Sequence, residues 1–269
     1  HKKSGRKLSY GDVVAFTRMP QELPKVGKSD LKKTADYRII GQPVPRVDIP
    51  EKARGAFEYG MDVQVPGMMY AAIARTPVDG ANVKSVMDAK AKKVAGVIGV
   101  FKLRDAVAVV GTSVEATQKA KNLLEIEWTK GKPAGFNSVK AASEYVARGQ
   151  NLADKGLDYE KVGDAPAAIK SAAKVYKADY QSDYTYHAQM EPMNVTAKVS
   201  PDGKGAELWL GTQAPGLAMF VASKILKTKI PMIRVHQKGL GGGFGRRIYP
   251  DLLAYGLILS KITKKPIKV

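Results

Sequence analysis

The chain of 269 residues lacks cysteine altogether and has only three histidines. Without cysteine it can form no disulfide, no zinc site with thiolate ligands and no iron–sulfur cluster of the ordinary kind. The histidines stand at positions 1, 187 and 236, a pattern that does not predict a multi-histidine metal site. We therefore expect no metal ion to be held by side chains of this chain.

Long hydrophobic runs are also missing, because no apolar stretch approaches the roughly 20 residues of a membrane-spanning helix. The composition, 44% hydrophobic and 26% charged, is typical of a globular protein. The first residue is His1 and not methionine. We therefore expect the start of the natural protein to be missing, and the compartment, periplasm or cytoplasm, is not predicted.

Acidic residues are scarce: 25 Asp and Glu stand against 44 Lys and Arg, which gives a net charge of +19. A strongly basic protein suits an anionic partner, surface or cofactor. The lysines are scattered along the chain, which favours a solvated basic face over nucleic-acid binding. A non-catalytic basic module that binds nucleic acid or another polyanion is the alternative.

Glycine, by contrast, is concentrated in one stretch, residues 239–247, which read Gly-Leu-Gly-Gly-Gly-Phe-Gly-Arg-Arg. Such a run lets the backbone take positive φ or approach a ligand closely. Residues 233–237 before it alternate as a strand, and an apolar helix is expected after Pro250. Bare amides and a helix N-terminus favour an anionic ligand. The other interpretation is a flexible surface loop.

The rest of the chain divides where its composition changes. We expect a peripheral lead-in over residues 1–53, an α+β module over 54–131 and a second α+β region over 132–269. Residues 112–115 read Thr-Ser-Val-Glu and predict a capping box at a helix start. Strands are predicted at 68–74, 94–101, 106–110, 124–128, 176–180, 195–199 and 207–210, and helices at 138–149, 165–173 and 217–225.

Three segments together resemble a known family. Residues 187–197, 211–213 and 241–247, in their order and spacing, resemble the large molybdenum-cofactor subunit of the xanthine oxidase/aldehyde oxidase family of molybdenum hydroxylases. Within it, the Gly-Gly-Gly-Phe-Gly-Arg-Arg sequence is most similar to the isoquinoline 1-oxidoreductase branch. The resemblance implies an α/β-hammerhead-like module at 54–131 and the first part of a molybdopterin-binding α+β domain at 132–269.

The resemblance also implies a cofactor, a molybdenum–pterin in its cytosine dinucleotide form, whose metal is held by the pterin dithiolene. In the family a glutamine lies near a molybdenum oxo group, and a Gly-Phe-Gly backbone packs against the pterin. The cofactor-binding residues implied here are Gln213, Gly242, Gly243, Phe244, Gly245 and Arg246.

His187 and Glu191 are the candidates for the substrate side of that site. A packed histidine and a glutamate that ties a loop to backbone amides are the corresponding structural roles, and the arginine pair has Asp251 as an alternative partner. The purine-oxidising branch has a substrate-binding glutamate where Ile248 stands, so a purine substrate is not expected. No catalytic residue is assigned, because no residue after Arg247 matches the motif of the family's glutamate base.

The implied reaction inserts a water-derived oxygen at an electron-poor carbon of an N-heterocycle or an aldehyde. Two electrons must then leave, and a chain without cysteine has no thiolates for a cluster. We therefore expect an iron–sulfur small subunit or a haem protein as the electron-accepting partner. We also expect these residues to be part of a longer catalytic subunit and inactive alone. A relative that keeps the fold without the cofactor is a third interpretation.

Overall fold

The computed structural model describes residues 4–18, 20, 22–151 and 153–269, and the chain divides into two compact units, His1–Ala56 and Phe57–Val269. The helices of the first unit are short: α1 (Tyr10–Phe16), η1 (Lys28–Asp30), η2 (Thr34–Asp36) and α2 (Ile49–Ala53). Ser9 caps α1, because its hydroxyl accepts from the Asp12 N–H at 3.1 Å while the Asp12 carboxylate accepts from the Ser9 N–H at 2.8 Å. None of these helices buries a residue, so local capping and turns define them.

The second unit is built on a seven-stranded mixed sheet with the order β3-β4-β1-β9-β6-β7-β8. Its strands are β1 (Met69–Arg75), β3 (Val97–Lys102), β4 (Ala106–Gly111), β6 (Thr196–Val199), β7 (Ala206–Leu210), β8 (Ile233–Gln237) and β9 (Ile267–Lys268). The short β9 joins two halves, because it pairs in parallel with β1 and antiparallel with β6. The expected mixed α+β class is confirmed, with one sheet running from residue 69 to residue 268.

The first half of this sheet is covered on both faces. Helices α3 (Ala89–Lys92) and α4 (Val114–Lys121) lie on one face, where Val109 packs among their alanines. On the other face, Ala108 and Val110 of β4 pack against Leu259. All of β4 is therefore buried, as its unbroken apolar sequence requires. A separate two-stranded ribbon of β2 (Val83–Met87) and β5 (Glu125–Trp128) completes this half.

Helix α4 is capped one residue later than the sequence predicts. The Ser113 hydroxyl accepts from the Ala116 N–H at 3.1 Å, whereas the Thr112 N–H donates to the Gly96 carbonyl at 2.9 Å. The capping box between Thr112 and Glu115 is therefore wrong. The Thr112 backbone is hydrogen-bonded at the strand end beside Gly96. Ser113, the next extended residue with a hydroxyl, therefore caps the helix.

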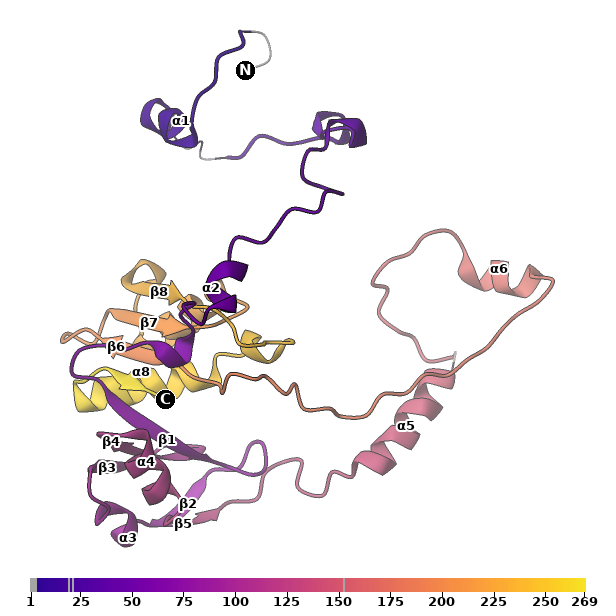
Figure 1. The fold of residues 1–269 in the computed structure, drawn as a ribbon. Coiled ribbons are helices and arrows are strands. Elements are labelled where there is room, and N and C mark those ends of the chain that lie inside the picture. Colours follow the sequence, from indigo (N-terminus) through magenta and orange to yellow (C-terminus); the bar gives the residue numbers. More distant parts are fainter. Residues whose placement is uncertain (1–3, 19, 21, 152) are drawn as a thin grey trace. The chain divides into compact units, whose positions relative to one another are not determined.

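The second half places two long helices, α7 (Pro215–Leu226) and α8 (Asp251–Thr263), against β6, β7 and β8. Figure 1 labels α8 beside these three strands. Their shared core consists of Val195, Ala197, Ala206, Leu208, Leu210, Ala218, Ala222, Leu226, Ile233, Leu253 and Leu257. The short helix η4 (Ile230–Met232) directly precedes β8, and η5 (Arg246–Ile248) lies between β8 and α8. Because β8 and α8 both contribute to this core, the glycine-rich loop between them is held at both ends.

The segment between the two halves contains α5 (Ser138–Gln150) and α6 (Ala165–Ser171). The strand predicted at residues 176–180 is wrong, because Tyr176 and Tyr180 are 81% and 94% exposed and no strand pairs with this segment in the described structure. Alternation yields a stable strand only where a neighbour accepts its hydrogen bonds. Among the described residues no helix is both long and apolar enough to cross a bilayer.

Helix α8 offers a test of this packing, since Leu257 is fully buried and Ile262 of the same helix is 52% exposed. We expect Leu257→Ala to lower the free energy of unfolding by about 2–5 kcal/mol, because it removes buried surface and leaves a cavity. The matched Ile262→Ala should change it by about 0.5 kcal/mol or less. Urea unfolding followed by circular dichroism measures both, and equal losses would contradict this placement of α8.

Candidate functional site

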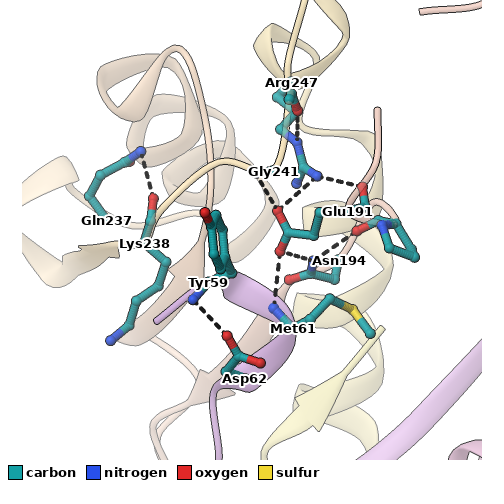
Figure 2. A network of polar contacts seen from close by, with 11 residues as sticks. Tyr59, Met61, Asp62, Glu191, Asn194, Gln237, Lys238, Gly241 and Arg247 are labelled. Atoms are coloured by element: carbon teal, nitrogen blue, oxygen red, sulfur yellow. Dashed lines mark hydrogen bonds and ion pairs between the residues drawn. The ribbon is translucent and has the colours of Figure 1, made fainter. Parts of the chain in front are cut away.

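A buried ion pair between Glu191 and Arg247 organises the candidate site (Figure 2). Glu191 precedes β6, Arg247 lies in η5 at the end of the glycine loop, and their side chains are 8% and 1% exposed. Arg247 Nη2 lies 3.0 Å from Glu191 Oε2 and donates to the backbone oxygen of Glu191 at 2.8 Å. A pair buried this deeply is stable only when most of its other polar atoms are also hydrogen-bonded.

The carboxylate of Glu191 meets that requirement with donors from distant segments (Figure 2). Its Oε1 accepts from the Met61 N–H at 3.1 Å and from the Asn194 amide at 2.8 Å. Its Oε2 accepts from the Gly241 N–H at 3.0 Å. Met61 belongs to η3 (Gly60–Asp62). Both oxygens thus face the protein, and Glu191 ties the loop to backbone amides, the structural role that the sequence left open beside the substrate-side one.

Arg247 shapes the loop from its other end. Its Nε donates to the Gly242 carbonyl at 2.7 Å, and its own carbonyl accepts from the Thr212 hydroxyl at 2.9 Å and the Gln213 N–H at 3.2 Å. One nitrogen, Nη1, is buried without a partner among the described residues. Arg247 therefore joins the loop to the segment that follows β7, and places Gln213 beside it.

The glycines of the loop are required first by the protein's own packing. A Cβ at Gly241 would lie 2.2 Å from the Glu191 Cβ, and one at Gly243 would lie 2.5 Å from Gln213 Oε1. Gly242 and Gly245 have φ of 97° and 93°, the left-handed region that other residues rarely adopt. At positions 241 and 243, the absence of a Cβ thus lets Glu191 and Gln213 pack closely against the loop backbone.

The glycine loop also has an open side, where Gln213 and Phe244 are exposed. The amides of Gly242, Gly243 and Phe244 have no acceptor in the described part of the chain. Gln213 Oε1 accepts from the Gly245 N–H at 3.0 Å, which leaves the Nε2 donor of this exposed side chain for another acceptor. The Phe244 side chain is 71% exposed, at a φ of 49°.

His187 lies beside this open side, because its Nε2 is 4.0 Å from the Cβ position of Gly245. The structure therefore brings together His187, Gln213 and residues 242–245, the greater part of the set expected from the sequence. Gln189, which the sequence analysis did not single out, also packs here, 3.4 Å from the Cβ position of Gly242. No periodicity in the sequence marks it, because Ala188, with a φ of 50°, interrupts the extended backbone between His187 and Gln189.

Arg246 forms an ion pair with an acidic residue. Its guanidinium and that of Arg75 each lie 2.6 Å from Asp251, at the first position of α8. Burial acts to raise the pKa of the Asp251 carboxyl, but the hydrogen bonds and charges of the two arginines outweigh it and lower that pKa. Two cations thus share one anion, so this group carries a net charge of +1 beside the loop.

Among the hollows of the described residues, one lies beside this arrangement and a large one lies apart from it. A cavity of about 20 Å³ beside Arg247, Asn194 and Thr212 has room for one water molecule. A groove of about 910 Å³ lies between α5 and residues 178–184, and no residue of the glycine loop lines it. Neither combines volume with the polar groups described above, so the open side of the loop is the candidate ligand surface.

The sequence of this chain is similar to those of known proteins. Residues 146–269 match the molybdopterin cofactor-binding domain family. The chain is 31% identical to the beta subunit of isoquinoline 1-oxidoreductase from Brevundimonas diminuta, over 100% of this chain and 39% of the relative. It is 25% identical to the molybdenum-binding subunit of aldehyde oxidoreductase from Escherichia coli, over 86% of this chain and 35% of the relative. It thus spans well under half the length of these relatives.

Solved structures show the same fold at lower identity. Quinoline 2-oxidoreductase from Pseudomonas putida 86 matches with a TM-score of 0.61 and 18% identity, over 84% of this chain and 34% of that one. Aldehyde oxidoreductase from Desulfovibrio gigas matches with a TM-score of 0.64 and 17% identity, over 83% and 29% of the two chains.

The buried ion pair predicts a large effect of a single substitution. We expect Arg247→Met to lower the free energy of unfolding by about 3–5 kcal/mol, because the Glu191 carboxylate stays buried without its cation. Arg234→Met, on the exposed side of β8, is the matched control and should have little effect. Urea unfolding measures both, and a loss of below about 1 kcal/mol for Arg247→Met would contradict the central role of the pair.

Asp251 predicts a pH dependence whose sign follows from its lowered pKa. A carboxyl with a lower pKa in the folded chain stabilises the fold above the ordinary value of 3.8, and this contribution is lost as the pH falls through the folded pKa. We expect Asp251→Asn to be less stable than the parent at pH 7, with a difference that shrinks below about pH 4. Thermal unfolding across this range measures it, with Asp158→Asn, an exposed loop residue, as control. A constant difference would contradict the assignment.

Proposed function

Since this chain belongs to the molybdenum hydroxylase family, with residues 146–269 in its molybdopterin cofactor-binding domain, we propose that it forms part of a catalytic subunit that hydroxylates N-heterocycles or aldehydes with water as oxygen source. The observation that carries the proposal is a group of unpaired donors at the glycine loop. The amides of residues 242–244 and the Nε2 donor of Gln213, which packs against Gly243, lie within the stretch that matches the domain family.

The unpaired donors suit a ligand rich in acceptor oxygens, as a molybdenum–pterin cofactor is. In the proposal, the amides of residues 242–244 and Gln213 Nε2 donate to the cofactor's oxygen atoms, and Phe244 packs against its ring. When bound, the cofactor supplies a redox-active metal that accepts the substrate's two electrons. We further propose the cytosine dinucleotide form, whose anionic tail would be attracted by the net positive group around Arg246 and Asp251.

The other residues of the site support these contacts. Glu191 and Arg247 hold the loop from behind, so that its amides keep their direction when a ligand binds. His187 is proposed for the substrate side, where its ring lies near Gly245. Ile248 makes a purine an unsuitable substrate, because an apolar side chain stands at the position of the carboxylate that binds purines in the family.

The proposed reaction needs an electron-accepting partner. The 269 residues have no cysteine with which to hold an iron–sulfur cluster, so the two electrons have to leave this part of the subunit for a group held elsewhere. An iron–sulfur small subunit or a haem protein is proposed. The similarity to a beta subunit and to a molybdenum-binding subunit of other oxidoreductases supports an assembly of more than one chain.

The test is metal analysis of the protein purified from its native host, together with dye-linked oxidation of N-heterocycles and aldehydes. We expect close to one molybdenum per chain, iron in the co-purifying partner, and turnover. Gly241→Ala should reduce the molybdenum content, because the new Cβ would overlap the Glu191 Cβ and displace the loop. Gly216→Ala, where nothing lies within 4 Å of the new Cβ, should not.

The polyanion-binding alternative predicts a different result. Binding of nucleic acid would weaken steeply with salt through counterion release, whereas a buried cofactor would be retained. Native protein that contains no molybdenum and binds nucleic acid in a salt-dependent manner would overturn the proposed function.

A further inference from the structure

Gln189 occupies a position at the site that no contact among the described residues explains. It belongs to residues 187–191, which run along the glycine loop. Glu191, at the end of this segment, accepts a hydrogen bond from the Gly241 N–H. The backbone of Gln189 lies 3.4 Å from the Cβ position of Gly242. Gln189 is therefore fixed against the part of the loop whose amides are unpaired.

The carboxamide of Gln189 is buried and unpartnered. Both its Nε2 and its Oε1 are closed to solvent, and neither has a hydrogen-bond partner among the described residues. The next residue toward the N-terminus, Ala188, has a φ of 50°, an unfavourable value for a residue with a Cβ. A strained backbone thus places two donors and one acceptor where the residues that the structure describes offer no hydrogen-bond partner.

These features are unfavourable for the stability of the chain by itself. A buried polar group without a partner destabilises a fold, whereas an apolar group of the same shape in its place is neutral or stabilising. A methionine would fill nearly the same volume as the glutamine without that penalty. The carboxamide is therefore accounted for by a partner from outside the chain.

We propose that the Gln189 carboxamide recognises a planar heterocycle that carries an N–H donor next to an acceptor. This rests on the proposed function, which supplies two such rings, the pterin of the cofactor and a heterocyclic substrate. A carboxamide matches this edge with one hydrogen bond in each direction. Because the carboxamide is closed to solvent in the chain alone, a neighbouring side chain must move on binding. The exposed Phe244 ring is the candidate, since its Cε2 lies 3.0 Å from the Cβ position of Gly242, beside Gln189.

The first measurement concerns the chain without ligand. Gln189→Met should raise the midpoint of thermal unfolding, by about 2 °C or more, because it removes the unpaired amide. Gln118→Met on the exposed side of α4 is the matched control and should leave the midpoint unchanged. A lower midpoint for Gln189→Met would show that the amide has a structural partner, and would overturn the proposal.

The second measurement concerns the native assembly, produced in a host that supplies the cofactor. We expect one of two effects of Gln189→Met. Either the molybdenum and pterin retained per chain fall about tenfold or more, or the KM for an N-heterocycle rises about tenfold or more. Loss of molybdenum and pterin identifies the cofactor ring as the partner. A raised KM with full molybdenum content identifies the substrate ring.

The outcomes separate this proposal from the one on which it rests. A parent protein that contains no molybdenum refutes the proposed function. A parent that contains molybdenum, with Gln189→Met equal to it in molybdenum, pterin and KM, refutes only the role of Gln189.

Discussion

The glycine loop depends on one buried interaction, the ion pair between Glu191 and Arg247. Removing two charges from water is expensive, and the interior stabilises them only when their remaining hydrogen bonds are made. That requirement draws the backbone of η3, the side chain of Asn194, the loop at Gly241 and Gly242 and the segment at Thr212 to one place. Segments far apart in the chain are thereby fixed around a single carboxylate and a single guanidinium.

The loop held by this pair combines close packing with unpaired amides. Gly241 and Gly243 let Glu191 and Gln213 approach to distances that any Cβ would block. The successive amides of residues 242–244 remain without acceptors among the residues that the structure describes. A loop that is anchored by the protein and keeps unpaired amides is preorganised, because the cost of fixing its backbone is met in folding and not on binding. The same glycines that satisfy internal packing thus make the backbone available to a ligand.

The frame that carries the loop comes from both halves of the sheet. β9 connects β1 with β6, and Asp251 connects Arg75 at the end of β1 with Arg246 beside the loop. Tyr255, also on α8, donates its hydroxyl hydrogen to Asp105 at 3.2 Å, which adds a second link to the first half. The first half therefore contributes to the position of the loop although it supplies none of the unpaired donors.

Elements whose pattern is local could be predicted from the sequence, such as strand β8 at residues 233–237, the apolar helix after Pro250 and the glycine loop between them. It also carried the family resemblance, since the motifs lie in short contiguous segments. The structure was needed to show that both carboxylate oxygens of Glu191 face the protein, that Arg247 is buried against it, and that residues 176–180 form no strand. Those outcomes depend on partners far away in the chain, 56 residues for Arg247 and Glu191. Burial and hydrogen bonding across such distances leave no periodicity in the sequence from which they could be predicted.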